Sequence, residues 1–251
     1  MSISVCMIAK DESENIERCL ESVKDIADEI IIGDTGSKDN TKEIAKRYTK
    51  KVFDISWDHD FSKARNECML YATKRWIFVI GADEAISSKD SDKIMQLIKD
   101  DTAIGYKFTQ RNYSDRVSSI KWRSSQRDGY EESSNFKGWQ YRGIIRLFRN
   151  NKGIRFRYPV HESVLPAIKD IKGKIKSSNI PIHHFQKYSI DKEQYYYQLL
   201  QKKILEFPEA NSFAEMALHC YEIGLEKEAK DHKKAALELN RNLGDALSFI
   251  R

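Results

Sequence analysis

Residues 3–34, ISVCMIAKDESENIERCLESVKDIADEIIIGD, alternate between two hydrophobic periods. Ile3 to Ile8 is an apolar run rich in β-branched residues, which predicts a buried strand. One helix face is then predicted from the spacing of Ile16, Cys19, Leu20 and Val23. A second apolar strand follows at Glu29–Ile32. Apolar strands separated by an amphipathic helix are typical of a parallel sheet that is covered by helices on both faces.

The same alternation continues over the next fifty residues. A helix is predicted to begin near Thr41, with Asp39 or Asn40 as its N-cap. Further strands are predicted at Val52–Ile55 and Trp76–Ile80, with a helix between them. We therefore predict an α/β fold with a Rossmann-like, mostly parallel, doubly wound sheet flanked by helices. Its ligands are expected at the C-terminal ends of the strands.

The hydrophobic pattern changes after Asp100. Residues 111–140 are polar and lack a clear period, which predicts an ordered active-site loop or an acceptor-binding insertion. Strands are predicted again at Ile144–Phe148 and Ile154–Tyr158. We predict one α/β domain over residues 1–188 and a helical tail over residues 189–251. Small residues in this tail fit the spacing of one tetratricopeptide unit, and a plain helical hairpin is the alternative: Ala217, Gly224, Ala229, Ala236 and Leu237.

Composition narrows the class of protein. The chain has 251 residues, of which 40% are hydrophobic and 32% charged, as in globular proteins. No apolar run exceeds five residues, which is too short to span a bilayer. Four scattered cysteines and the lack of a signal-peptide pattern predict a cytoplasmic protein, with peripheral binding to the inner membrane face as a further option.

Charge is concentrated in the middle of the chain. Thirteen Lys and Arg lie between Lys107 and Arg157, against four acidic residues. This segment is either a solvated basic face or a surface that attracts an anion such as a diphosphate, an acidic glycan or a membrane. No nucleic-acid-binding motif is present, so we expect no nucleic-acid partner.

Four polar clusters follow the predicted strands in chain order. They are Ile8–Glu12, Asp34–Thr41, Trp57–Asn66 and Gly81–Glu84. A carboxylate at a strand end, such as Asp34, could accept hydrogen bonds from a base N–H or a ribose hydroxyl. The Arg65 guanidinium could hold a phosphate or pin Asp34. Asp83 is placed where Mg²⁺ or Mn²⁺ would be held beside a diphosphate.

In this order the clusters resemble family 2 glycosyltransferases of the GT-A fold. The resemblance is carried by residues 4–48 and by the segments DFSKARN, WIFVIGADE, IIRLFRNNKGIRFRYPVHES and IPIHHFQKY, which end at Tyr188. The branch that they resemble includes bacteriocin peptide S-glycosyltransferases and glucosyltransferases of lipopolysaccharide core assembly. Membership of that branch implies a GT-A domain, and the helical tail is similar to the tetratricopeptide segments of its peptide-modifying members.

The resemblance implies specific roles. Donor binding would involve Ala9, Glu12, Asp34, Arg65, Ala82 and Asp83, with Asp34 at the nucleobase and Arg65 supporting it. A divalent metal, Mn²⁺ or Mg²⁺, would be held by Asp83 and His184. The base would be Glu162, or His161 as second choice, although these two could instead be a structural pair that holds a loop. Gly81 replaces the first Asp of the family's Asp-x-Asp motif, which implies weaker donor binding.

The implied activity is inverting transfer of a hexose from UDP-glucose or UDP-N-acetylglucosamine. The predicted acceptor is a Ser, Thr or Cys side chain of a peptide or protein. One alternative acceptor is a cell-surface or lipid-linked oligosaccharide. An alternative from another class is a non-catalytic scaffold that binds a nucleotide sugar, which the substitution at Gly81 motivates. We also expect that the C-terminal helices could form a homodimer.

Overall fold

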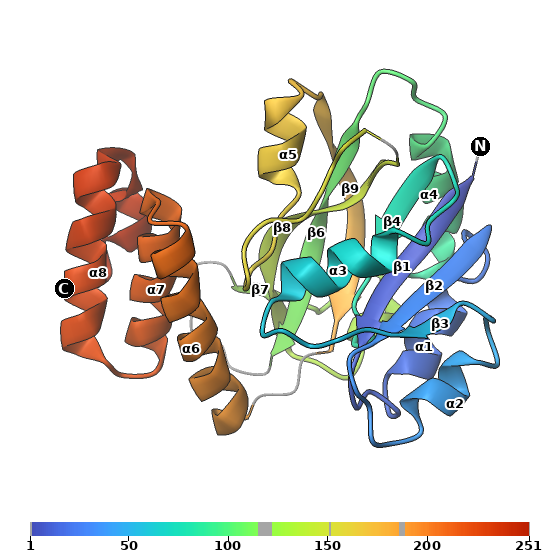
Figure 1. The fold of residues 1–251 in the computed structure, drawn as a ribbon, viewed down its shortest axis with the longest axis horizontal. Helices are drawn as coiled ribbons and strands as arrows, with labels where there is room; N and C mark the ends of the chain where they lie inside the picture. The colour runs from blue at the N-terminus through green and yellow to red at the C-terminus, as the bar shows by residue number, and fades with distance from the viewer. Residues whose placement is uncertain (1, 115–121, 151, 186–188, 251) are drawn as a thin grey trace. The chain divides into compact units, whose positions relative to one another are not determined.

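Figure 1 shows a computed structural model of the protein, which describes residues 2–114, 122–150, 152–185 and 189–250. The chain divides into two compact units. The first consists of Met1–Asp58, Lys63–Arg157 and Ser163–Gln186, and the second of His59–Ser62, Tyr158–Glu162 and Lys187–Arg251. The domain boundary predicted after residue 188 falls at residues 186–188, outside the described residues.

A single mixed sheet forms the centre of the first unit. Its strands are β1 (Ile3–Ala9), β2 (Glu29–Asp34), β3 (Val52–Asp54), β4 (Trp76–Val79), β5 (Glu84–Ala85), β6 (Gly105–Ser114), β7 (Trp122–Ser124), β8 (Gly138–Arg149) and β9 (Ile175–His184). Their order among the described residues is β3-β2-β1-β4-β8-β6-β9-β5, with β7 paired to β8. The first four strands of this order are parallel. β8 is antiparallel to β4 and β6, and β5 is antiparallel to β9.

Helices cover both faces of this sheet (Figure 1). They are α1 (Ile16–Val23), α2 (Thr41–Ala45), α3 (Phe61–Met69), α4 (Ser91–Leu97) and α5 (Leu165–Asp170), with short 3-10 turns at Ser88–Asp90 and Glu131–Ser133. One core layer joins α1, α2 and α4 to Val5 and Met7 of β1. The other joins α3 and α5 to Cys6, because successive strand residues point to opposite faces. The predicted α/β fold class is confirmed.

The strand predicted at Ile154–Tyr158 is wrong. Ile154 and Phe156 are buried and alternate with exposed Arg side chains, which imitates a strand. The backbone of Phe156 instead pairs with the Asn66 amide, through N–H···Oδ1 at 2.8 Å and Nδ2–H···O at 2.9 Å. A side chain of α3 therefore satisfies the backbone groups that a neighbouring strand would otherwise bind.

Strands extend into the segment that we predicted to be a loop. β6 and β8 pair from Gly105↔Phe148 to Ser114↔Gly138, while residues 115–121 lie outside the described residues. The polar side chains here are locally partnered. The Arg111 guanidinium lies 4.6 Å from the Tyr130 ring and 4.5 Å from the Trp139 ring, and it binds Asp128 at 2.8 Å. These strands pack through cation–aromatic contacts. They therefore lack the apolar period from which the other strands were predicted.

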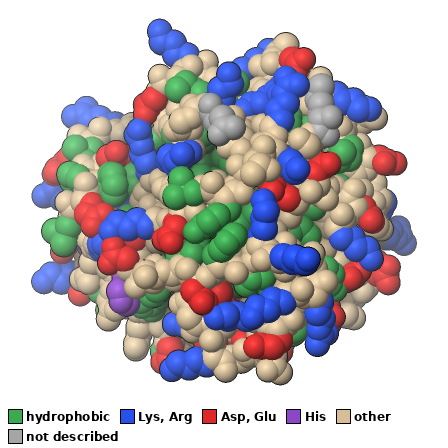
Figure 2. All heavy atoms as spheres, turned by 45° about the vertical axis from the view of Figure 1, so that its right-hand side comes forward, with side chains coloured by type: hydrophobic (Ala, Val, Ile, Leu, Met, Phe, Trp, Pro, Cys, Tyr) green, Lys and Arg blue, Asp and Glu red, His purple; other side chains and the backbone are tan. Residues whose placement is uncertain are grey.

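The basic middle segment is partly neutralised by acidic residues. Among its described residues, four arginines form ion pairs: Arg111–Asp128, Arg146–Glu84, Arg149–Asp101 and Arg157–Asp170. In Figure 2, basic and acidic side chains are interspersed over the visible face. The fold therefore brings carboxylates to a segment that has few of its own.

The second unit is built on three helices and two short turns. These are α6 (Ile190–Glu206), α7 (Ala210–Glu222), α8 (Glu226–Leu239) and the 3-10 turns Arg241–Leu243 and Asp245–Leu247. Ala217 of α7 and Ala229 and Ala236 of α8 are fully buried in its core. Gly224 turns the chain between α7 and α8 with φ of 83°. The helical tail is confirmed, and its tetratricopeptide-like character stays a prediction. In the described part of the chain, no helix has the length and apolarity needed to cross a membrane.

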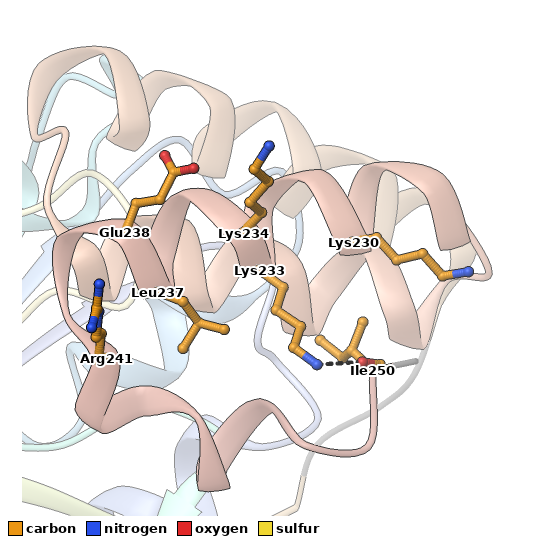
Figure 3. Close-up of a pocket in the computed structure, with 7 residues that line it drawn as sticks. All are labelled: Lys230, Lys233, Lys234, Leu237, Glu238, Arg241 and Ile250. Atoms are coloured by element: carbon orange, nitrogen blue, oxygen red, sulfur yellow. Dashed lines mark hydrogen bonds between the residues drawn. The ribbon is translucent and has the colours of Figure 1, made fainter.

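A groove of about 600 Å³ lies on this second unit (Figure 3). Leu237 and Ile250 supply its apolar lining, and Glu238 is the acidic residue among those that line it. The cations that line it are Lys230, Lys233, Lys234 and Arg241. Lys233 Nζ donates a hydrogen bond of 2.6 Å to the Ile250 carbonyl. The groove is therefore positively charged.

Glu29 at the start of β2 provides a test of stability against pH. Its carboxylate accepts hydrogen bonds from Ser4 Oγ, Lys51 Nζ and Thr73 N. Burial raises the pKa of Glu29, but these hydrogen bonds outweigh burial and lower the pKa to about 2, from 4.5. The ionised form is thus favoured by folding, and its contribution to stability is present above pH 4.5 and lost as pH falls towards 2.

We expect Glu29→Gln to lower the free energy of unfolding at pH 7. The difference between wild type and variant should shrink as pH falls from 4.5 to 2, and urea unfolding at several pH values measures it. Glu226→Gln, at an exposed site, is the control and should change stability by less than about 0.5 kcal/mol. The prediction would be contradicted if the difference in free energy of unfolding between wild type and Glu29→Gln did not depend on pH.

Candidate active site

The carboxyl ends of β1, β2 and β4 meet at one edge of the sheet. Ala9 is the register partner of Asp34, and the Ala9 carbonyl accepts a hydrogen bond of 2.9 Å from Thr35 N. β4 is parallel to β1 and leads directly into Gly81–Glu84. The edge that the sequence predicts as the ligand site therefore carries residues of the first, second and fourth polar clusters.

Asp34 is the last residue of β2 and is buried at this edge. Its side chain is 1% exposed. Oδ1 accepts hydrogen bonds from Gly36 N at 2.9 Å and Ser37 N at 2.8 Å, in a turn where Gly36 has φ of 106°. Among the described residues, none donates a hydrogen bond to the buried Oδ2. A buried acceptor without a donor is costly, so Oδ2 suits an N–H or O–H group of a ligand.

The loops after β1 and β2 are bound to each other. Glu12 N donates to Thr41 Oγ1 at 2.7 Å, and Ser13 N donates to Asp39 Oδ2 at 3.0 Å. Asp39 Oδ1 accepts a hydrogen bond from Thr41 N at 3.0 Å, at the start of α2. Of the two predicted caps, Asp39 is therefore the one whose side chain binds the helix start. These contacts fix the position of Glu12 relative to the β2 loop.

Two other predicted donor-binding residues are buried. Arg65 lies on α3 with its guanidinium 5.7 Å from the centre of the Phe156 ring. Its predicted contact with Asp34 stays a prediction. Ala82 is 4% exposed and belongs to the core layer under α1. Its methyl group therefore packs inward, and Ala82 would reach a ligand through its backbone.

The two predicted metal ligands are in contact although they lie far apart in sequence. His184 Nε2 lies 3.0 Å from Asp83 Oδ2, and His184 Nδ1 lies 2.6 Å from Asn112 Oδ1. Phe185 N also donates to the Asp83 carbonyl at 2.9 Å. Asn112 and His184 are register partners in β6 and β9. Pairing of β9 with β6 and β5 thus delivers His184 to the end of β4.

The Glu84 carboxylate binds the turn that carries Asp83 to β6 and β8. It is 1% exposed and accepts hydrogen bonds from Gly81 N at 2.6 Å, Gln110 Nε2 at 2.5 Å and Arg146 Nη2 at 2.6 Å. Burial raises the pKa of Glu84, but the Arg146 guanidinium and the His184 imidazole outweigh burial and hold the pKa below its usual value. Glu84 is therefore a buried, ionised anchor for the turn that presents Asp83.

Both backbone polar groups of Gly81, in the same turn, are hydrogen-bonded. Its carbonyl accepts a hydrogen bond from Cys19 Sγ at 3.2 Å, and its N–H binds Glu84. A Cβ atom at this position would lie 2.9 Å from Asp83 Oδ1 and 3.3 Å from Glu84 Oε2. An aspartate at position 81 would therefore add a third carboxylate close to two others, unless Asp83 moved.

Sequence reasoning missed several neighbours of the Asp83–His184 pair. Arg18 of α1 lies with its guanidinium 3.8 Å from the centre of the Phe185 ring. Burial lowers the pKa of Arg18, and the carboxylates of Asp83 and Glu12 partly oppose this effect. Arg18 and Asn112 had no motif to mark them, because only the fold brings α1 and β6 to this edge.

His183 precedes His184 but has a different environment. It is fully buried, its Nδ1 lies 2.6 Å from the Tyr113 hydroxyl, and burial lowers its pKa to about 4. A neutral, buried His183 is therefore structural at pH 7. Strand alternation in β9 leaves His184 as the histidine that faces Asp83.

The predicted bases belong to the second unit. His161 Nδ1 lies 2.9 Å from Glu215 Oε2 of α7. Glu162 follows it and is half-buried. The structure brings the predicted donor-site and metal-site residues to the first unit, and the catalytic roles of His161 and Glu162 stay a prediction.

Asp83 and His184 fit a divalent metal as a partial ligand set. Carboxylate oxygen and imidazole nitrogen are ligands that Mn²⁺ accepts, and carboxylate oxygen suits Mg²⁺. Within the described ranges, no group of three His, Cys, Asp or Glu residues is arranged to hold a metal. These two residues would therefore need further oxygen ligands, which a diphosphate can supply.

Comparison with known proteins places this site in a class. The sheet and the helices that cover it are those of a GT-A domain. Residues 4–164 match the model of glycosyl transferase family 2, and the chain belongs to that family.

Two curated relatives cover 64% of the chain each. A TPR repeat-containing protein of Synechococcus elongatus is 35% identical over 162 residues, which are 35% of its length. The SPbeta prophage-derived glycosyltransferase SunS of Bacillus subtilis is 30% identical over 169 residues, which are 34% of its length. The chain thus spans about a third of the length of these relatives.

Solved structures share the fold at low sequence identity. TarS 1-349 of S. aureus, in complex with UDP-GlcNAc, has a TM-score of 0.55 and 13% identity, over 99% of this chain and 76% of that one. Glucosyl-3-phosphoglycerate synthase of Mycobacterium tuberculosis, with Mn²⁺, UDP and glucosyl-3-phosphoglycerate, has a TM-score of 0.52 and 16% identity, over 80% of each chain. These likenesses confirm the GT-A fold.

The Glu84–Arg146 pair gives a prediction about the integrity of the site. Arg146→Met removes the guanidinium and leaves the Glu84 carboxylate buried without its cation. We expect a loss of about 3–5 kcal/mol in the free energy of unfolding, because an uncompensated buried charge is costly. Urea unfolding measures this loss.

Lys24→Met is the matched control, because it breaks an ion pair with Glu21 in which both side chains are about half exposed. It should cost less than about 1 kcal/mol. The double variant Glu84→Gln/Arg146→Met should recover part of the loss. Equal effects of Arg146→Met and Lys24→Met would show that Glu84 is not a buried anchor.

Proposed function

We propose that this protein is an inverting glycosyltransferase that moves a hexose from a UDP-sugar to a Ser, Thr or Cys side chain of a peptide or protein. The observation that carries the proposal is the contact between Asp83 and His184 at the sheet edge that also holds Asp34. Family membership supports the transfer chemistry. The acidic strand end and the late histidine are the groups that a metal-bound diphosphate requires.

The donor would lie along this edge. The unpartnered Oδ2 of Asp34 could accept the N–H of a uracil base, and the backbone at Ala9 and Ala82 could line the nucleoside. Two proteins with the same fold were solved with UDP-GlcNAc or with UDP and Mn²⁺, which supports a UDP-sugar and a divalent metal. Asp83 and His184 would hold that metal, which would neutralise charge on the diphosphate.

In the reaction, the acceptor oxygen or sulfur forms a bond to the anomeric carbon. The bond from that carbon to the diphosphate oxygen breaks, and UDP leaves with the electron pair. His161 or Glu162 takes the acceptor's proton. Attack from the face opposite to the departing UDP inverts the anomeric configuration. Asp34 and Glu12 bind and orient the donor during this step.

The choice of a peptide acceptor rests on relatives. SunS is named as a glycosyltransferase. The branch of the family that this sequence resembles includes peptide S-glycosyltransferases. The name of the Synechococcus relative supports a tetratricopeptide-like tail, which suits a polypeptide partner. An oligosaccharide acceptor is the second candidate, favoured by the positive groove on the second unit. We also propose that the protein is located in the cytoplasm, where UDP-sugars are made.

The first test is release of UDP from UDP-glucose and UDP-N-acetylglucosamine, with and without Mn²⁺. We expect metal-dependent release by the wild type. Asp83→Asn and His184→Ala should each lower it by about 100-fold or more, because both would bind the metal. Asp92→Asn, an exposed aspartate of α4, is the matched control and should retain full activity.

Unchanged release in Asp83→Asn would remove the basis of the proposal. A protein that binds both nucleotide sugars in a thermal-shift assay but never releases UDP, even with acceptors added, would be a scaffold. For the acceptor, mass spectrometry of Ser-, Thr- and Cys-containing peptides after incubation should show a hexose adduct. Altered surface glycans in a deletion strain, with no peptide adduct, would favour the oligosaccharide.

A further inference from the structure

We infer that Glu215 of the helical tail is a positioning residue for His161, and that Lys203 fixes Glu215 in turn. The inference rests on the proposed function and extends it, because it makes His161 the stronger candidate for the base. It assigns the tail a part in catalysis that neither the family match nor the names of the relatives imply. All the residues involved belong to the second unit.

The backbone around His161 is strained. His161 has φ of 51° and Tyr158 has φ of 81°, in the region that non-glycine residues rarely adopt. Such conformations are unfavourable and persist only where surrounding contacts impose them. Fully buried Val160 lies between the two, in the core of the second unit. The segment is thus held in a conformation that its own residues do not favour.

Contacts within the second unit, from Phe61 and from the tail, hold this conformation. The Pro159 carbonyl accepts a hydrogen bond of 2.9 Å from Phe61 N, and the Tyr158 hydroxyl donates to Glu209 Oε2 at 3.0 Å. The Val160 carbonyl lies 3.4 Å from Lys203 Nζ. Residues of the second unit therefore bind the three residues that precede the histidine.

Glu215 contacts the imidazole directly. Its Oε2 lies 2.9 Å from His161 Nδ1 and 2.6 Å from Lys203 Nζ. Burial raises the pKa of Glu215, but the hydrogen bond from His161 and the charge of Lys203 outweigh burial and lower the pKa. Glu215 is therefore ionised at neutral pH, and an ionised carboxylate can only accept hydrogen bonds.

Lys203 is built into this arrangement. Its side chain is 3% exposed, and its ammonium lies 4.3 Å from the centre of the Tyr158 ring. A lysine with so little access to water is rare unless it is paired. Glu215 supplies the pairing charge, and the ion pair fixes the carboxylate oxygen that faces His161. The tail thus contains a fixed series of contacts from Lys203 through Glu215 to His161.

The chemical consequence follows from the hydrogen-bonding rules for imidazole. Because the ionised Glu215 can only accept, the proton of a neutral His161 resides on Nδ1. Nε2 is then the acceptor nitrogen, which is the form that a general base requires. The carboxylate also stabilises the positive charge that the ring gains when it takes the acceptor's proton. These features favour His161 over Glu162 as the base of the proposed reaction.

The test compares Glu215→Leu with Glu215→Gln and with the matched control Glu193→Leu. Glutamine retains an oxygen that can accept from both Nδ1–H and Lys203. Glu193 lies 3.6 Å from His219 Nδ1 in the same unit, so its replacement removes a carboxylate near a different histidine. Long-range ¹H–¹⁵N spectra of the full chain report the tautomer of each histidine, and kcat and KM for the UDP-sugar are measured alongside.

We expect neutral His161 of the wild type to carry its proton on Nδ1. Glu215→Leu should mix the tautomers and lower kcat by about 10–100-fold, with KM for the donor unchanged. Glu215→Gln should retain most of both properties, and Glu193→Leu should leave both unchanged.

Other outcomes overturn the inference in distinguishable ways. An unchanged His161 tautomer in Glu215→Leu would show that Glu215 does not position the ring. A changed tautomer with wild-type kcat would show that the positioning has no catalytic role. If kcat fell equally in Glu193→Leu and Glu215→Leu, the loss would result from lower stability and not from the positioning of His161. If the wild type itself releases no UDP, the proposed function fails, while the spectra still decide whether Glu215 fixes the tautomer.

Discussion

The buried carboxylate of Glu84 is the group on which the geometry of the candidate site depends. It accepts hydrogen bonds from the turn after β4, from β6 and from β8, and its backbone pairs with His184 of β9. Three segments, the turn after β4, β6 and β8, therefore meet at one side chain, and β9 joins them through the backbone. Its neighbour Asp83, in the turn before β5, contacts His184. A neutral residue at position 84 could not gather three donors in the same way.

The sheet topology explains why the two predicted metal ligands, Asp83 and His184, occur in different halves of the sequence. The parallel strands β1, β2 and β4 bring their carboxyl ends to one edge by right-handed crossovers, so their clusters follow one another at regular intervals. β9 reaches the same edge by pairing with β6 in parallel and with β5 in antiparallel fashion. The histidine therefore comes 101 residues after the aspartate that it contacts. Such a pairing needs the whole second half of the sheet to be in register.

The sequence predicts the first half of the fold well, because its strands and helices have clean periods. Ile16, Cys19, Leu20 and Val23 are all buried, as their spacing requires. The second half is predicted less well. Arg111 packs between aromatic rings, in a strand that lacks an apolar period. Phe156 follows the period of a strand, but its backbone binds the Asn66 side chain instead of a neighbouring strand. Only the family resemblance predicted that Asp83 and His184 lie close together, because it implies that both bind one metal. Asn112, Arg18 and Glu215 had no local signal, since tertiary contacts alone bring them to functional groups.

The helical tail holds the segment Tyr158–Glu162, which carries the proposed base. A short loop with two residues at positive φ has no means of its own to hold an imidazole in one orientation. The tail supplies an ion pair whose lysine is buried, and breaking a buried pair is more costly than breaking an exposed one. That cost is what fixes the carboxylate, and the fixed carboxylate in turn selects one tautomer of His161. Removing the tail would therefore expose a strained loop and release its histidine, even if the sheet and the Asp83–His184 pair kept their geometry.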